Sequence, residues 1–203
     1  MTEILACERS IDDLYNWVKR ENYLGWDPYD ALNSKIVQKI TFNNPYLETI
    51  IIQINKYSMI NFRHLLKIQK GVDLKGIALF AQAYSKLWKL TKKEDYIKDL
   101  KSFLYIIDNR SLRSRHTFDC WAGHYFPYTA IDKSTLDENT PELIATSQVI
   151  NALVDSYKLL REDKLKQMAI SAYDFLIQNL LERLEAGVCF FKYSLTENDK
   201  IVL

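Results

Sequence analysis

The chain has 203 residues, of which 48% are hydrophobic and 26% are charged, proportions that exclude a disordered chain. Its formal net charge of +1 gives no electrostatic reason to expect nucleic acid or an anionic membrane as a partner. Five glycines and four prolines are few for this length, which favours long helices over a fold of many short strands.

The N-terminus and the cysteines predict a soluble protein of the cytoplasm. Residues 1–8 contain no basic segment followed by an apolar one, so no secretory signal is expected. The longest apolar runs, such as Ile50–Ile52, span only a few residues, so no membrane-spanning segment is expected. Cys7, Cys120 and Cys189 are odd in number and far apart, which indicates reduced thiols and not a disulfide framework.

The first helix is expected to begin at Ser10, whose hydroxyl suits the N-cap position. Apolar side chains at helical spacing predict its buried stripe. The stripe consists of Ile11, Leu14, Trp17 and Val18. Residues 25–34 follow as a connector with two aromatic residues, two carboxylates and an amide. Because proline fixes its own φ and restricts the preceding residue, Asp27-Pro28 predicts a stiff, non-helical segment. This connector is either a functional loop or a plug at one end of a helical core.

Asn44-Pro45 predicts the start of the next helix, because asparagine suits the N-cap and proline the first helical position. The apolar face of this helix consists of Leu47, Ile50, Ile51, Ile54 and Tyr57. Two pairs of segments then repeat one pattern, in which a helix that is apolar on most sides precedes an amphipathic one. The pairs are 76–88 with 96–109, and 143–154 with 165–180. This repeat predicts inner–outer helical hairpins.

Between the two hairpins lies the longest irregular segment, residues 110–140, which contains two of the three histidines. Loops longer than about 15 residues without secondary structure of their own are uncommon in compact domains and are often functional. We therefore expect this segment to contribute to a site.

Several short pieces of the chain together resemble the six-hairpin glycosidase-like proteins of prokaryotic polysaccharide-biosynthesis clusters. The pieces are Gly25-Trp26-Asp27-Pro28-Tyr29-Asp30-Ala31-Leu32-Asn33-Ser34, Asn61-Phe62-Arg63, Lys75-Gly76-Ile77-Ala78-Leu79-Phe80, Cys120-Trp121, and Thr140-Pro141 ahead of Ala145-Thr146-Ser147. The resemblance runs over most of the chain, and its first piece is the most specific. After Cys120-Trp121 the chain lacks the second tryptophan and the glutamine of the family pattern.

The resemblance implies an all-α fold, an (α/α)6 barrel or toroid built from inner–outer helical hairpins. Sugar epimerases, unsaturated glucuronyl hydrolases and terpenoid cyclases share this toroid. The sequence predicts about three hairpins, whereas a closed ring needs six. We therefore expect residues 1–203 to form a single domain that corresponds to the N-terminal half of a toroid.

Glycoside chemistry needs two carboxylates across a pocket or an equivalent acid–base pair. The predicted catalytic residues are Asp27, Asp30, Asp119 and His124. Aromatic faces suit the apolar faces of sugar rings, and polar side chains suit their hydroxyls. The predicted substrate-binding residues are Trp26, Tyr29, Asn33, Arg63, Trp121, Tyr125 and Tyr128. The alternative is structural: Asp27 caps a turn, Asp119 is a solvated loop residue, and the aromatic residues pack at the end of the barrel.

No metal or cofactor is expected. The spacing of His116, Asp119, Cys120 and His124 matches no standard zinc pattern. The sequence also has no glycine-rich phosphate loop and no nucleotide-binding fingerprint. Cys120, beside two histidines, is either a nucleophile or a buried, inert thiol.

We therefore expect a protein that binds or processes carbohydrate in cytoplasmic polysaccharide biosynthesis, with a saccharide or glycan as ligand. Any activity would be that of a glycosidase or a sugar epimerase. The alternative is a non-catalytic helical-hairpin scaffold, or a truncated remnant, that binds a partner protein. Half a ring would expose apolar faces, and large exposed apolar patches drive association. The expected partner is thus a second copy or a complementary C-terminal half.

Overall fold

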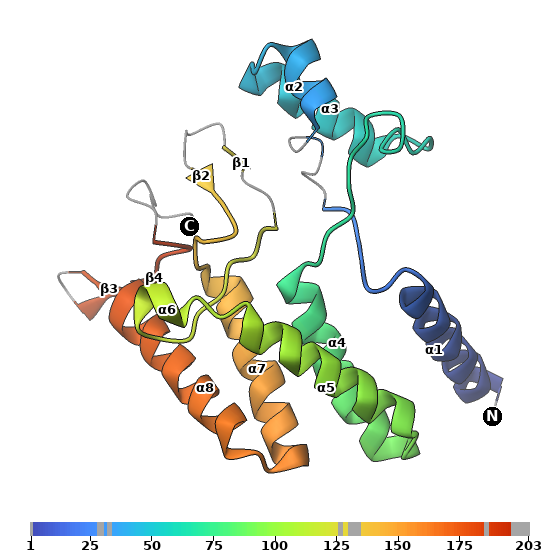
Figure 1. Ribbon diagram of the computed structural model, residues 1–203, viewed down its shortest axis with the longest axis vertical. Coiled ribbons are helices and arrows are strands. Elements are labelled where there is room, and N and C mark those ends of the chain that lie inside the picture. Colours follow the sequence, from blue (N-terminus) through green and yellow to red (C-terminus); the bar gives the residue numbers. More distant parts are fainter. Residues whose placement is uncertain are drawn as a thin grey trace. The chain divides into compact units, whose positions relative to one another are not determined.

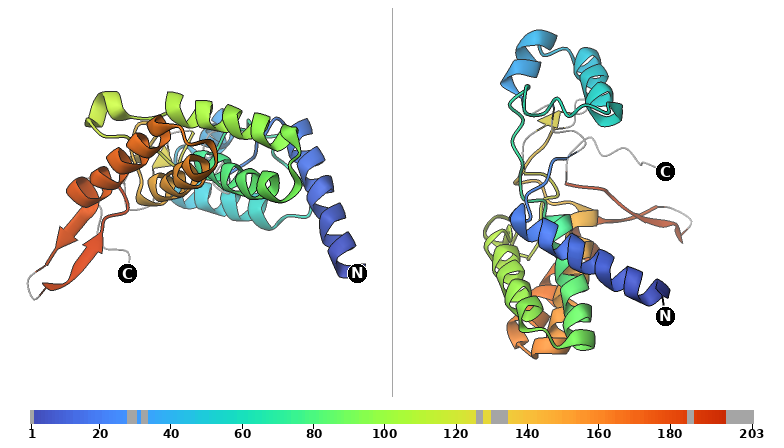
Figure 2. Two further views of the ribbon diagram at one scale, coloured as in Figure 1. Left: turned by 90° about the horizontal axis from the view of Figure 1, so that it is seen from below. Right: turned by 90° about the vertical axis from the view of Figure 1, so that its right-hand side faces the viewer.

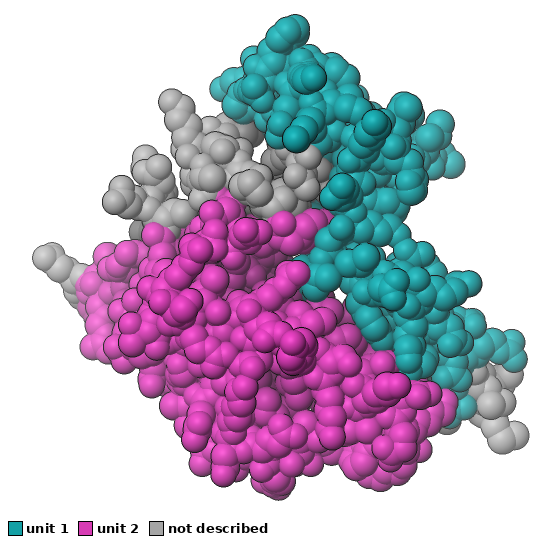
Figure 3. All heavy atoms as spheres, viewed as in Figure 1, with its two compact units in different colours: residues 1–73 teal, residues 74–203 magenta. Residues whose placement is uncertain are grey.

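A computed structural model of the chain describes residues 2–27, 31, 34–125, 128–129, 135–184 and 187–195 (Figure 1). The described part is predominantly α-helical, which confirms the predicted all-α class. Where the sequence predicts a single domain, the chain divides into two compact units, Met1–Asp73 and Leu74–Leu203 (Figure 3).

The described part of the first unit contains three helices, α1 (Thr2–Arg20), α2 (Lys35–Thr41) and α3 (Pro45–Tyr57). The prediction that Ser10 begins the first helix is wrong. Ser10 lies in the middle of α1, and its hydroxyl donates a hydrogen bond to the carbonyl of Ala6 (2.9 Å). The predicted stripe is also largely wrong, because Val18 is buried but Leu14 and Trp17 are about half exposed.

The caps of α2 and α3 follow from local sequence. The Asn44 side chain accepts hydrogen bonds from the backbone of Tyr46 and Leu47, with proline at the first helical position, as predicted. The Ser34 hydroxyl caps α2 at the Val37 N–H and donates to the Leu66 carbonyl (2.6 Å). Ser34 therefore ties α2 to a segment that lies more than 30 residues along the chain.

The core of the first unit is small. Its buried members are Ala31, Ile52 and Ile68, against which Trp26, Ile51 and Leu66 pack. The apolar face predicted for α3 is largely wrong, because Ile52 and Asn55 are the buried residues of this helix, although the predicted Ile51 packs against the core. The predicted residues Leu47, Ile50, Ile54 and Tyr57 are 43–74% exposed.

The second unit is built on two helical hairpins (Figure 1). The first consists of α4 (Leu74–Thr91) and α5 (Glu94–Asn109), and the second of α7 (Leu143–Leu160) and α8 (Asp163–Phe175). Helices α4 and α7 pack on each other as well as on their own hairpin partners. They therefore take the inner positions, as predicted, while α5 and α8 take the outer ones (Figure 2). A closed toroid stays a prediction.

Packing between these helices matches the periodicity of the sequence. Tyr96, Leu100, Phe103, Leu104 and Ile107 form the buried face of α5. The ring of Tyr84 on α4 lies 5.4–5.5 Å from the rings of Tyr96 and Phe103, within the range of favourable aromatic pairs. Between the inner helices, the Gln82 amide donates to the Gln148 side chain (3.3 Å).

Shorter elements gather at the end of the second unit where α4 and α7 begin (Figure 1). They are α6 (Arg113–His116), β1 (Tyr128–Thr129), β2 (Thr135–Leu136), the π-helical turn η2 (Leu176–Leu180), β3 (Leu181–Arg183) and β4 (Cys189–Phe191). Strands β1 and β2 pair antiparallel, as do β3 and β4. In the second pair Leu181 faces Phe191 and Arg183 faces Cys189. After β4, Ser194 forms an antiparallel bridge with Glu142 at the start of α7.

None of the described helices combines the length and the apolar character that a membrane crossing needs.

Candidate functional site

Two segments of the second unit, those of His124 and Tyr193, converge on the carboxylate of Glu142, which is fully buried. The Tyr193 hydroxyl donates a hydrogen bond to Oε2 (2.9 Å), and His124 Nε2 lies 3.2 Å from Oε1. His124 is itself almost fully buried. Buried carboxylates are costly unless they are paired and hydrogen-bonded. The convergence of a histidine and a tyrosine on one carboxylate makes this cluster the candidate site.

The backbone around Glu142 explains how the cluster is positioned. Pro141 forms an antiparallel bridge with Ala122, and the Glu142 N–H donates to the Trp121 carbonyl (3.0 Å). Glu142 is the N-cap residue of α7, with an extended backbone, so its charge lies at the positive end of the helix dipole. The segment that follows β4 is attached to the start of α7, because the Leu143 N–H donates to the Tyr193 carbonyl (2.8 Å).

Gly123 leaves room for the buried carboxylate. A Cβ atom built on Gly123 would lie 2.3 Å from Oε2 of Glu142, far inside van der Waals contact. Only glycine allows the backbone and the carboxylate to approach this closely. The segment that carries His124 is therefore shaped around Glu142 at two consecutive residues.

Trp121 is fully buried, so no face of its ring is open to a ligand. Its indole Nε1 donates to the Ile107 carbonyl (2.8 Å), one of the last carbonyls of α5, which have no partner within the helix. Its backbone N–H donates to the Thr146 hydroxyl on α7 (3.2 Å). The predicted sugar-stacking surface is therefore, in this structure, a core residue that caps α5 and joins it to α7.

Asp119 is buried in a polar network and is not a solvated loop residue. The Ser111 hydroxyl donates to its Oδ1 (2.6 Å), and Arg113 Nε lies 3.4 Å from the same oxygen. The Asp119 N–H donates to the Ser171 hydroxyl on α8 (2.8 Å). Arg113 also pairs with Asp108. These contacts attach the start of the long segment to both outer helices.

Two pKa shifts describe the electrostatics near this network. Burial raises the pKa of the Cys120 thiol to about 12, and the negative charge of Asp119 adds to the effect. The thiol thus stays protonated near neutral pH, which disfavours a nucleophilic role. Burial would raise the pKa of Asp108, but hydrogen bonds from Lys164 and Arg113 outweigh it and hold the pKa below its ordinary value.

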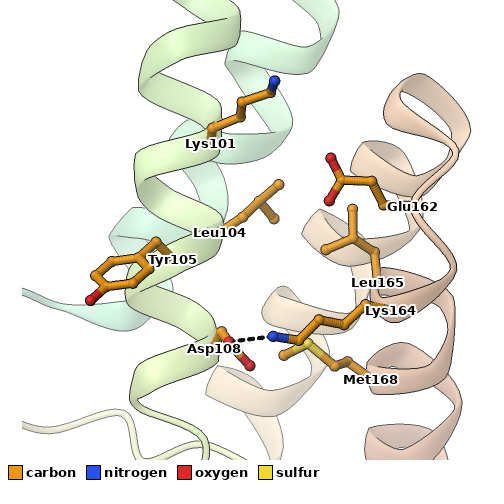
Figure 4. A pocket seen from close by; sticks show the side chains of 8 residues that line it. All are labelled: Lys101, Leu104, Tyr105, Asp108, Glu162, Lys164, Leu165 and Met168. Carbon is orange, nitrogen blue, oxygen red and sulfur yellow. Dashed lines mark hydrogen bonds and ion pairs between the residues drawn. The ribbon is translucent and has the colours of Figure 1, made fainter.

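A hollow of about 300 Å³ lies between α5 and α8 (Figure 4). Its lining residues are Lys101, Leu104, Tyr105, Asp108, Glu162, Lys164, Leu165 and Met168. The only ion pair drawn across it joins Lys164 to Asp108 (2.6 Å), whose charge is already compensated. None of the predicted site residues lines this hollow, so it does not strengthen the predicted site.

In the first unit, the structure brings Trp26 and Arg63 together, two of the predicted substrate-binding residues. The Arg63 guanidinium lies 5.6 Å and the Lys70 ammonium 4.5 Å from the centre of the Trp26 ring. His64 meets the ring edge-on at 5.3 Å, and the indole N–H donates to the Ile68 carbonyl (3.3 Å). A sugar stacking on Trp26 would have to compete with these cation–π contacts.

The predicted site residues are thus divided between the two units. Trp26, Asp27 and Arg63 belong to the first unit, and Asp119, Trp121, His124 and Tyr125 to the second. Tyr29, Asp30 and Asn33 lie outside the described residues, and Tyr128 is described only as part of β1. Asp27 and Tyr125 are half-buried. Sequence reasoning missed Glu142 and Tyr193. A glutamate between Pro141 and an apolar helix, where an N-cap serine or asparagine is usual, is the signal that could have found Glu142.

Within the described ranges, no group of three or more His, Cys, Asp or Glu side chains is arranged to hold a metal ion. Comparison with protein-family models, with curated proteins and with solved structures found no match for the chain.

Proposed function

We propose that the chain binds or processes carbohydrate as a member of the (α/α)-toroid class, in cytoplasmic polysaccharide biosynthesis. The observation that carries the proposal is the buried Glu142–His124 pair, which lies at the end of the second unit where the loops gather. Functional residues concentrate in loops that a rigid scaffold positions. The two-hairpin scaffold also fits the fold that the family resemblance implies.

In this proposal His124 is the acid–base group of the site. A histidine oriented by a carboxylate is the common arrangement for moving a proton to or from a substrate hydroxyl. Its neighbour Tyr125 would contact the sugar. Asp119, held by Ser111 and Arg113, would act by keeping the segment in place.

Titration calorimetry against neutral hexoses, N-acetylhexosamines, uronic acids and their short oligomers tests this function. For a saccharide that binds, His124→Ala is expected to weaken binding at least about tenfold, which corresponds to roughly 1.4 kcal/mol. The matched control is His116→Ala, a histidine of the same loop that pairs with the ring of Phe175 and is expected to leave the affinity within about twofold.

Circular dichroism of both variants checks that they fold. Absence of binding to every saccharide tested, or equal weakening by both substitutions, would contradict the proposed function.

The second candidate function is that of a scaffold that binds a protein, and the exposed face of α3 favours it. Leu47, Ile50, Ile54 and Tyr57 recur at helical spacing on this helix and are 43–74% exposed. Exposed apolar patches are typical of association surfaces, which supports the predicted self-association.

Sedimentation velocity tests this association. The wild-type chain is expected to sediment faster as its concentration rises, whereas Ile50→Glu with Ile54→Glu shifts it towards the monomer. Gln53→Glu, on an exposed polar position of the same helix, is the control and is expected to behave like wild type. A monomer at every concentration would exclude self-association through this face.

A further inference from the structure

We infer that Glu142 is a positioning residue that holds His124 in the tautomer with its proton on Nε2, leaving Nδ1 as the basic nitrogen. The acid–base role of His124 rests on the proposed function, but this arrangement does not. The evidence for this arrangement is the set of groups that surround the two carboxylate oxygens of Glu142.

The carboxylate of Glu142 is surrounded as an anion would be. Oε2 accepts a hydrogen bond from the Tyr193 hydroxyl (2.9 Å), and Oε1 faces Nε2 of His124 (3.2 Å). Its N-cap position places it at the positive end of α7, a helix of 18 residues, where a negative charge is stabilised. Fully buried, it has no water to replace a missing donor.

An ionised carboxylate only accepts hydrogen bonds, and a neutral imidazole has one donor and one acceptor nitrogen. If the His124 proton were on Nδ1, the Nε2 lone pair would face the lone pairs of Oε1 in a buried site. The distance between Nε2 and Oε1 is that of an ion pair, although the two groups are not aligned as a hydrogen bond.

The tight packing of Gly123 limits how far Glu142 can move away. Because Oε2 already occupies the space of the missing Cβ, the carboxylate is confined between the backbone of Gly123 and the hydroxyl of Tyr193. This confinement is what a positioning role requires. With the proton on Nε2, the buried Nδ1 carries the lone pair of the imidazole.

Nitrogen NMR of protein labelled with ¹⁵N-histidine tests the inference without a ligand. The chain has three histidines, so single substitutions assign every ring signal. At alkaline pH, where an imidazole is neutral, His124 is expected to show the Nε2–H form alone. The exposed His64 serves as the reference with averaged tautomers.

Two variants change the carboxylate in different ways. Glu142→Gln replaces the carboxylate by a neutral amide. Gly123→Ala displaces the carboxylate but keeps its charge. Both are expected to move the His124 nitrogen shifts towards those of His64. The control Glu138→Gln, an exposed glutamate of the same loop, is expected to leave them unchanged.

An Nδ1–H form of His124 in the wild type, or shifts unchanged by both Glu142→Gln and Gly123→Ala, would overturn the inference. A failure of the proposed function alone gives a different result: His124 shows the Nε2–H form, but no saccharide binds.

Discussion

Replacement of Glu142 by alanine is expected to lower the free energy of unfolding by about 3–5 kcal/mol, the range for removing one partner of a buried pair. The substitution removes the acceptor of the Tyr193 hydroxyl bond and the ion-pair partner of His124 Nε2. It also opens a cavity beside Gly123, where the carboxylate is packed. Urea unfolding followed by far-ultraviolet circular dichroism measures the effect.

Glu138→Ala is the matched control, because Glu138 lies in the same loop and is exposed. Surface substitutions of this kind usually change stability by less than about 0.5 kcal/mol. The double variant Glu142→Ala with His124→Ala is expected to lose less than the sum of the two single losses, since both remove the same pair. Equal losses for Glu142→Ala and Glu138→Ala would show that the pair does not stabilise the fold.

Trp121→Ala is expected to cost about 3–5 kcal/mol, the range for truncating a buried aromatic side chain to alanine. The indole fills the core between α5 and α7, and its N–H caps the Ile107 carbonyl. Trp121→Phe separates the two contributions. The phenylalanine ring keeps most of the packing but leaves the Ile107 carbonyl without its indole donor. About 1–3 kcal/mol of the loss in unfolding free energy is therefore expected to remain.

The control for Trp121→Ala is Tyr105→Ala, a largely exposed aromatic residue on α5, the helix that Trp121 caps. It is expected to change the free energy of unfolding by less than about 0.5 kcal/mol. If Trp121→Ala were as mild as this control, the ring would be accessible and not a core residue. The original interpretation as a sugar-stacking surface would then regain support.

Local rules predicted the helical hairpins well. The alternation of mostly apolar and amphipathic segments identified α4, α5, α7 and α8, because each apolar position needs burial at a spacing that only a helix repeats. The Asn44-Pro45 cap also worked, since its hydrogen bonds span only two or three residues. Ser10 failed as a cap because its hydroxyl also bonds to a carbonyl one turn earlier within a helix.

The face of α3 shows where periodicity is insufficient. The pattern Leu47, Ile50, Ile51, Ile54 and Tyr57 is a correct helical stripe, yet the small core of the first unit buries Ile52 and contacts the stripe at Ile51. An apolar stripe in the sequence indicates only that one side of a helix is apolar. Which side is covered depends on elements from other parts of the chain, here Ala31 and Ile68.

The candidate site depends on such distant contacts almost entirely. Residue types in the chain were enough to predict an all-α protein built from hairpins. They were also enough to select His124 within residues 110–140, the long segment between the two hairpins. They did not identify Glu142, because the partners that make it notable come from residues 124 and 193. The β3–β4 hairpin brings Tyr193 back to α7, and the bridge from Ala122 to Pro141 brings His124 there. Helices follow from interactions a few residues apart, whereas a buried carboxylate acquires its role from groups that only folding places beside it.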